Sequence, residues 1–245
     1  MMSDVMTPRS WLLETPLQND EQLYAVFSST SDADPLTVYR QLSGTDVPVA
    51  LWDKTPYASW TPVMPYLVAI APNSPFLDWV AEVDAQDWGW LAVSCQPMAI
   101  IAEHLRSLTQ VFMPSGEAVF FRFWDGRYIY PIVHGLGKTA GELMPMFGRY
   151  LINGRSLEVG TREVPKVRDW PWWEAPQALL DSLVEDDPTT LIDNIMQWLE
   201  DERPDIYNIW PESNLKLKIT RFVRASNAPK NLKQALLNHL AQEQG

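Results

Sequence analysis

Residues that bind metals or act as nucleophiles are scarce in this 245-residue chain. It has one cysteine, Cys95, which excludes an intrachain disulfide, and the apolar sequence around Cys95 favours a core thiol over a reactive one. The three histidines, His104, His134 and His239, are scattered, and none has a cysteine or a second histidine at ligand spacing. The sequence therefore predicts neither a metal site nor a bound cofactor.

The motifs of common active sites are missing as well. There is no GxSxG elbow, GxxxxGK[ST] loop or GxGxxG fingerprint, and the Gly-containing stretch His134-Gly-Leu-Gly-Lys138 lacks phosphate-loop spacing. A glycosidase would need two carboxyl groups beside a sugar, for which Asp78 with Glu82, or Glu185-Asp186-Asp187, are the candidates. These positions fit exposed helix faces and helix ends equally well, so we expect no catalytic residue, no small-molecule substrate and no enzyme.

Long apolar runs and excess positive charge are also lacking. No stretch approaches the roughly 20 apolar residues of a membrane helix. The first residues, MMSDVMTPRSW, have neither the basic nor the apolar region of a secretory signal. A formal charge of −12 makes nucleic acids and anionic membranes poor partners. We therefore expect a soluble, cytoplasmic protein.

Aromatic residues are abundant, and they concentrate between Val111 and Arg127. An apolar run there meets a Pro-Ser-Gly-Glu turn and resumes in an aromatic stretch that predicts a central strand, buried on both faces. Phe121 and Trp124 belong to this structural motif. A buried Arg122 would need a partner, for which Asp125 is the candidate.

The order of predicted elements indicates an α/β (α+β) fold. The pattern predicts strands over 22–27, 47–52, 65–70, 88–95, 149–152 and 156–164, and helices over 35–42, 76–83 and 98–108, with a helical turn at 143–147. A mixed β-sheet with flanking helices follows for residues 1–165. Beyond a Pro- and Trp-rich boundary, helices over 178–184, 189–202, 215–225 and 231–242 predict a small all-helical lobe for residues 166–245.

Charge is segregated within the predicted helical lobe. Ten acidic residues and only Arg203 lie between Asp181 and Glu212, whereas the segment from Leu215 to Asn238 has six basic residues and no acidic one. Two oppositely charged helical layers with solvated outer faces would explain this pattern. A basic docking face, including Arg221 and Arg224, for an acidic segment of a partner is the functional alternative.

Five short segments together resemble a known bacterial family. They are Met64-Pro-Tyr-Leu-Val68, Ser74-Pro-Phe-Leu77, Trp88-Gly89, the helix ending His104-Leu-Arg106, and Pro114-Ser-Gly116 followed by Phe121-Arg-Phe-Trp-Asp125. In this order, over residues 20 to 150, the chain resembles the effector chaperone or adaptor domain family of the type VI secretion system, first catalogued as a domain of unknown function. Two residues depart from the family pattern, since Trp124 replaces a Tyr and Gly126 a Pro.

The resemblance implies a binding role. Similar proteins bind a toxic effector in the cytoplasm and help to load it onto the valine-glycine-repeat spike protein (VgrG), and they are not enzymes. We expect an apolar, helical N-terminal segment of the client to bind in a groove between or beside the two lobes, with Trp170, Trp172 and Trp173 as aromatic anchors. Arg122, Asp125 and Arg127 would hold the platform in shape, with Arg127 the most exposed.

Two other classes of function remain open from the sequence. A carbohydrate-active enzyme or sugar-binding module would use two carboxyl groups about 5 to 10 Å apart beside exposed tryptophans. An immunity-type inhibitor would use the acidic surface against a basic toxin. Neither the identity of the client nor the oligomeric state follows from the sequence.

Overall fold

The chain folds into two compact units, Met1–Ala175 and Pro176–Gly245. A computed structural model describes residues 5–42, 46–160, 162–166, 168–186, 188–225 and 232–242. The division falls after Ala175 instead of after residue 165. Residues 166–175 therefore belong to the N-terminal unit, because Trp172 and Trp173 pack against its core.

A six-stranded sheet organises the N-terminal unit. Its strands, in spatial order, are β2 (Val49–Ala50), β3 (Tyr66–Ile70), β1 (Gln22–Phe27), β4 (Gly89–Ser94), β7 (Arg149–Ile152) and β8 (Arg155–Glu158). The predicted α+β class is confirmed, but the sheet is antiparallel throughout and not mixed.

The turn between β7 and β8 explains why these two strands run antiparallel. Asn153 and Gly154 both have positive φ, 50° and 70°, as a two-residue hairpin turn requires. A turn this short can only join antiparallel strands. The Asn-Gly pair is therefore a local sequence signal for an antiparallel edge of the sheet.

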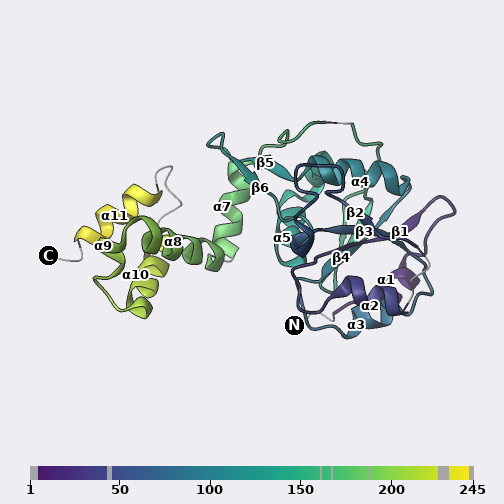
Figure 1. Cartoon of the computed structure of the whole chain (residues 1–245), viewed down its shortest axis with the longest axis horizontal. Coiled ribbons are helices and arrows are strands. Elements are labelled where there is room, and N and C mark those ends of the chain that lie inside the picture. Colours follow the sequence, from purple (N-terminus) through teal and green to yellow (C-terminus); the bar gives the residue numbers. More distant parts are fainter. Residues whose placement is uncertain are drawn as a thin grey trace. The chain divides into compact units, whose positions relative to one another are not determined.

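Helices cover both faces of this sheet (Figure 1). Helices α1 (Pro8–Glu14), α2 (Pro35–Leu42) and α3 (Phe76–Glu82) pack on one face, and α4 (Met98–Ser107), α5 (Gly126–Leu136) and α6 (Ala140–Leu143) pack on the other. Short 3-10 helices η1 (Thr61–Val63) and η2 (Gly137–Thr139) lie in the connections. Alternate residues of β1 enter the two cores because successive strand side chains point to opposite faces.

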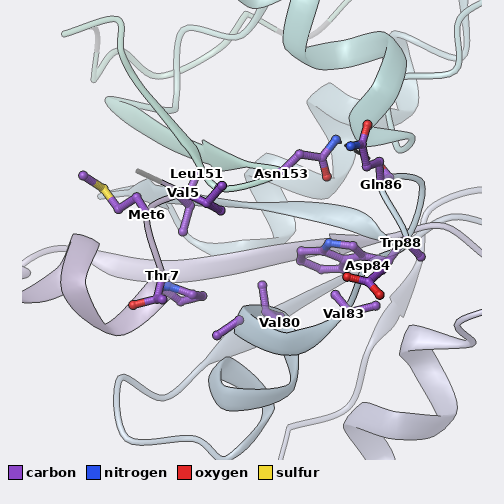
Figure 2. Close-up of a pocket in the computed structure, with 14 residues that line it drawn as sticks. Val5, Met6, Thr7, Val80, Val83, Asp84, Gln86, Trp88, Leu151 and Asn153 are labelled. Carbon is purple, nitrogen blue, oxygen red and sulfur yellow. Dashed lines mark hydrogen bonds between the residues drawn. The ribbon is translucent and has the colours of Figure 1, made fainter. Parts of the chain in front are cut away.

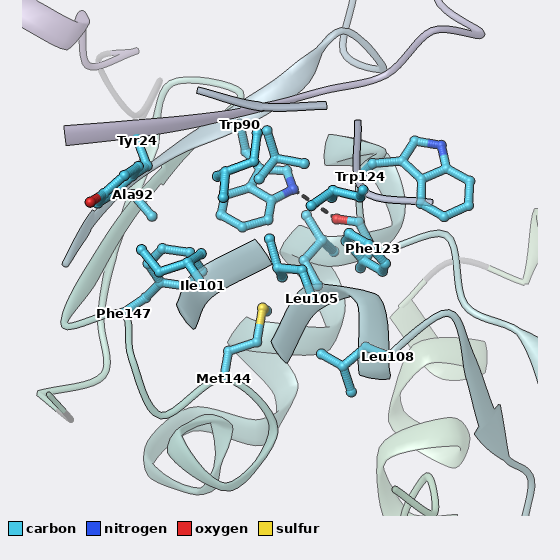
Figure 3. Packing of buried hydrophobic residues seen from close by; sticks show 14 of the residues in the cluster. Tyr24, Trp90, Ala92, Ile101, Leu105, Leu108, Phe123, Trp124, Met144 and Phe147 are labelled. Atoms are coloured by element: carbon cyan, nitrogen blue, oxygen red, sulfur yellow. Dashed lines mark hydrogen bonds between the residues drawn. The ribbon is translucent and has the colours of Figure 1, made fainter. Parts of the chain in front are cut away.

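The larger core lies between the sheet and α4 (Figure 3). Ile101, Leu105 and Leu108 from the α4 segment are fully buried there. The indole Nε1 of Trp90, in β4, donates to the carbonyl oxygen of Phe123 at 2.7 Å. This bond fixes the turn before α5 to the central strands.

The aromatic hairpin differs from its prediction. Strands β5 (Gln110–Phe112) and β6 (Ala118–Phe120) form a separate two-stranded sheet, so the predicted long central strand is wrong. The strand ends at Phe120, because Asp125 caps α5 and the preceding residues turn into that helix. Phe121, Phe123 and Trp124 are buried as expected, whereas Phe120 is 40% exposed.

The C-terminal unit is helical, as predicted. It contains α7 (Gln177–Asp186), α8 (Thr189–Glu202), α9 (Pro204–Tyr207), α10 (Glu212–Ala225) and α11 (Leu232–Gln242). Its own core includes the fully buried Leu199, Leu215, Ile219, Leu236 and Leu240. Within the described ranges, no helix of either unit has the length and apolar character needed to cross a membrane.

Candidate functional site

Asp125 organises the polar network at the start of α5. The side chain is fully buried and accepts hydrogen bonds from Arg122 Nη2 at 2.9 Å and from Arg127 Nη2 at 2.8 Å. Its other oxygen accepts from the Arg127 backbone N–H at 3.0 Å and from Arg127 Nε at 3.1 Å. One carboxylate thus caps the helix and holds two guanidinium groups.

Both arginines of this network reach the surface. The side chain of Arg122 is 42% exposed and that of Arg127 is 48% exposed, so Arg122 is not the buried cation that a central strand would have required. Arg127 also lies 3.4 Å from Asp87, and Arg122 lies over the Tyr128 ring at 4.7 Å. The hydrogen bond to Asp125 is the main cause that raises the pKa of Arg127. The network is built to hold the turn in shape.

Trp172 and Trp173 pack on the N-terminal unit. Trp172 Nε1 donates to Ser107 Oγ at 3.0 Å, and the Arg168 guanidinium lies 4.2 Å from the Trp172 ring centre. Trp173 stacks on Phe121 with ring centres 6.2 Å apart. Both indoles are half-buried against the larger core. They fasten the segment after residue 165 to the domain, which leaves them little free surface as anchors for a partner.

Trp170 lies at the edge of an exposed group of aromatic rings. We define the aromatic surface as Tyr57, Trp60, Phe120 and Trp170, with the buried Trp52 beneath it. Trp60 and Phe120 are 45% and 40% exposed and stack with ring centres 5.6 Å apart. Tyr57 lies 5.1 Å from Trp60, 5.0 Å from Phe120 and 6.5 Å from Trp170.

No sequence pattern marks Tyr57, Trp60 or Phe120 as a site residue. Tyr57 and Trp60 lie in the loop between β2 and η1, where neither helical nor strand periodicity assigns a face. The aromatic stretch that contains Phe120 predicts a buried strand, in which Phe120 would not be exposed. The available signal was the sequence Trp52-Asp-Lys-Thr-Pro-Tyr57-Ala-Ser-Trp60, in which aromatics alternate with polar residues in a turn-rich segment.

The aromatic surface is suited to contact with another molecule. Rings with exposed edges and faces supply large apolar area at low cost in conformational entropy, and aromatic residues are enriched in the energetic centres of protein interfaces. At this surface Gln110 Nε2 donates a hydrogen bond to Tyr57 Oη at 3.4 Å. The arrangement favours packing against apolar groups over proton transfer.

Arg221 and Arg224 lie on α10 in the C-terminal unit, and both are exposed. Other basic groups on this helix have partners within the unit. Lys216 Nζ is 2.7 Å from Asp193, and Lys218 Nζ lies over the Trp210 ring at 5.3 Å. The Lys216–Asp193 pair joins the basic helix α10 to the acidic helix α8, as two attracting layers would. Lys230 lies outside the described residues.

The histidines have structural surroundings. His104 is buried, and its Nε2 donates to the carbonyl oxygen of Leu143 at 2.8 Å in the tautomer that carries the proton there. Burial lowers the pKa of His104 and so favours the neutral ring. His134 and His239 lie beside the Tyr130 and Phe222 rings. A search of the described ranges finds no group of three His, Cys, Asp or Glu arranged to hold a metal.

Among the residues that the structure describes, the carboxylates that a glycosidase would need are not found in the environment of a general acid. Asp78 forms an exposed ion pair with Arg9, whose hydrogen bond is the main cause that lowers the pKa of Asp78. A general acid needs the opposite shift. Glu82 is exposed on the same helix. The side chains of Glu185 and Asp186, and all of Asp187, lie outside the described part of the chain.

A cavity of about 340 Å³ lies between the N-terminal segment, the end of α3 and the β7–β8 turn (Figure 2). Val5, Val80 and Leu151 line it alongside polar groups from Asp84 and Asn153. Asn153 Nδ2 donates a hydrogen bond to the carbonyl oxygen of Gln86 at 3.0 Å.

Cys95 lies outside this cavity and is partly exposed. Burial is the main cause that raises the pKa of its thiol, so the reactive thiolate is disfavoured.

Residues 23–140 match the family model described as a domain of unknown function, DUF4123. The matched span begins in β1 and extends past η2. It contains the Arg122–Asp125–Arg127 network and three of the four rings of the aromatic surface. Comparison with curated proteins and comparison with solved structures gave no significant match.

Proposed function

We propose that this chain is a cytoplasmic adaptor, or chaperone, of the type VI secretion system. In this role it binds a toxic effector through the aromatic surface and helps to load that effector onto the VgrG spike. The chain itself performs no chemistry on its client. Its partners are two proteins, the effector and the spike, with no nucleic acid, membrane or small-molecule substrate involved.

The exposed aromatic surface is the observation that carries this proposal. Trp60 and Phe120 keep nearly half of their area in solvent, although the same domain buries other large aromatics completely. Contiguous exposed aromatic groups of this kind mark interaction sites more than they mark ordinary surface. An adaptor needs such a face on a rigid support, and Trp52 and Trp124 supply buried rings beneath it at 5.1 Å from each other.

The family resemblance supports the same role. The five segments that resemble type VI adaptors all lie inside residues 23–140, the span that matches the DUF4123 model. In the structure, Asp125 and its arginines brace the start of α5. A scaffold role for this motif is consistent with a domain whose task is to hold another polypeptide.

Genetics and co-purification together test the proposal. We expect a tagged full-length chain to co-purify with the effector encoded by the neighbouring gene. We also expect deletion of the chain to abolish delivery of that effector while leaving the secretion apparatus able to assemble. Delivery that continues undiminished without the chain, or failure of the two purified proteins to associate, would overturn the adaptor role.

A sugar-binding module is the second candidate, because exposed tryptophan faces also stack on pyranose rings. Trp60 is the residue best placed for this. Titration of the purified chain with soluble glycans, followed by tryptophan fluorescence, separates the two. A saturable shift that is lost in Trp60→Ala supports sugar binding, and no shift at millimolar glycan removes this candidate.

A further inference from the structure

The outer edge of β6 leaves backbone hydrogen-bonding groups unpaired. Phe112 N–H donates to the carbonyl oxygen of Trp173 at 2.8 Å, and its own carbonyl accepts from Ala175 at 2.9 Å, so both groups point away from β6. Phe112 pairs with Ala118 and Gln110 with Phe120. In an antiparallel ladder such pairs alternate with hydrogen-bonded ones, so Ala118 and Phe120 also direct their N–H and C=O outward.

The neighbouring backbone hydrogen bonds agree with this alternation of hydrogen-bonded and non-hydrogen-bonded residue pairs between β5 and β6. Met113 N–H donates to Glu117 at 2.8 Å, and Phe121 N–H donates to Thr109 at 3.0 Å, which are the flanking hydrogen-bonded pairs. Across the described ranges, no partner is present for the four outward groups of Ala118 and Phe120. Ala118 and Phe120 are both exposed, while Val119 is partly buried against the core.

The opposite edge of this two-stranded sheet, along β5, already carries an added extended segment. There, the extended segment Trp173–Ala175 adds to β5 through two backbone hydrogen bonds and a parallel bridge between Phe112 and Glu174. Its side chain Trp173 packs on Phe121. Backbone pairing together with an aromatic anchor therefore holds an added strand at one edge, and β6 offers the same combination at the other.

The side chains beside the free edge belong to the aromatic surface. Ala118 and Phe120 lie on one face of β6, since residues two apart share a face. Phe120 stacks on Trp60 and lies 5.0 Å from Tyr57. A strand laid along β6 would place alternate side chains against these rings.

We propose that an extended segment of the client adds to β6 as a further strand, with apolar side chains packed on Trp60 and Phe120. This inference rests on the proposed adaptor function and specifies its mode of binding. An extended polypeptide fits this edge, because its own backbone N–H and C=O groups have the spacing needed to pair with the outward groups of Ala118 and Phe120. A second copy of this chain fits less well, because each copy has a charge of −12 and the two would repel each other.

The test uses the full-length chain and the full-length effector encoded by the neighbouring gene. Ala118→Pro removes one outward N–H without touching the hydrogen bonds between β5 and β6, and proline is tolerated at strand edges. Ala118→Ser keeps the N–H and is the matched control. We expect Ala118→Pro to bind the effector at least ten-fold more weakly and Ala118→Ser to bind within two-fold of wild type.

Amide exchange in the wild-type chain gives a second measurement that does not depend on how the proline variant folds. We expect the Ala118 and Phe120 amides to exchange at least ten-fold more slowly when the effector is bound. The Val119 amide, which faces β5, should change little. Slowed exchange at both outward amides, together with weak binding by Ala118→Pro, supports strand addition.

Each remaining outcome overturns the inference in a distinguishable way. Equal binding by Ala118→Pro with unchanged exchange refutes strand addition and leaves the adaptor function standing. A wild-type dimer that Ala118→Pro converts to a monomer, in the absence of effector, assigns the edge to a second copy. No binding of the effector by the wild type ends the adaptor function, and the strand-addition mode ends with it.

Discussion

At the scale of single residues, Asp125 carries the most consequence because it is a fully buried charge. It accepts four hydrogen bonds, all from Arg122 and Arg127, and it caps α5. The side chains of the two arginines are partly exposed to solvent, so their positive charges alone would not fix their positions. The carboxylate therefore fixes the geometry of the turn that connects the hairpin to the helix.

Asp125→Asn tests this role. An amide keeps the shape, but its NH2 group would face a guanidinium donor and the charge-assisted hydrogen bonds would be lost, so we expect a loss of about 2 kcal/mol in the free energy of unfolding. Urea denaturation of the full chain measures it. Asp87→Asn is the control, since Asp87 contacts Arg127 at only 3.4 Å and should cost less than about 1 kcal/mol. Equal effects of the two substitutions would contradict the account.

The sequence could predict the Arg122–Asp125 pair but not the exposure of Arg122. A charged residue in an apolar run needs a nearby counterion, and Asp125 is three residues away, which made the partner identifiable. Exposure depended on where the strand ended. Aromatic residues at Phe121, Phe123 and Trp124 are buried in a strand and in a packed turn alike, so the pattern alone could not locate that end.

At the scale of elements, the start of α5 depends on close backbone packing. A Cβ at Gly126 would lie 2.7 Å from the carbonyl oxygen of Gln86 and 2.9 Å from that of Gly89. These oxygens belong to the backbone before and at the start of β4, so they cannot move aside as a flexible side chain can. Glycine at this position therefore permits the start of α5 to pack closely against this backbone.

Gly126→Ala should therefore destabilise the chain by about 1 to 3 kcal/mol, which is the usual cost of overpacking. Gly135→Ala, in the same helix at an exposed position, should instead stabilise it by up to about 1 kcal/mol, through helix propensity. Thermal unfolding of both variants beside wild type measures the two effects. A neutral result for Gly126→Ala would show that the contact with β4 is looser than described.

Most elements were predictable because their patterns are local. Strand β1, helix α2 and the helices of the C-terminal unit follow apolar periodicity, capping residues and prolines that lie within each segment. Helix α5 was not predicted, because Pro131 and two glycines lie within its sequence and glycine and proline are poor helix formers. The aromatic surface depends on three separate segments meeting, which no local pattern records.

At the scale of the whole molecule, each unit has its own core. The N-terminal unit has two, one on each face of its sheet, and the C-terminal unit has a separate cluster around Leu199 and Leu236. The Pro- and Trp-rich segment marked the boundary in sequence. Its exact position depends on Trp172 and Trp173, whose packing on the N-terminal unit becomes known only from the structure.

Two fragments test the position of this boundary. A fragment of residues 1–175 should unfold cooperatively, because it keeps both cores of the N-terminal unit and the packing of Trp172 and Trp173 on that unit. A fragment of residues 1–165 loses the Trp172 and Trp173 packing and the backbone bonds to Phe112, so we expect it to be at least about 2 kcal/mol less stable. Urea denaturation compares them, and equal stability would place the boundary at residue 165.

The central claim is that an exposed aromatic surface on a rigid domain captures a polypeptide. The most direct measurement is the dissociation constant of the purified full-length chain for the purified effector, compared among three proteins. For a variant that combines Trp60→Ala with Phe120→Ala, the account predicts binding at least ten-fold weaker than wild type. It predicts unchanged binding for Leu13→Ala, an exposed apolar residue on α1 outside the aromatic surface. Equal affinity of all three proteins for the effector would contradict the claim.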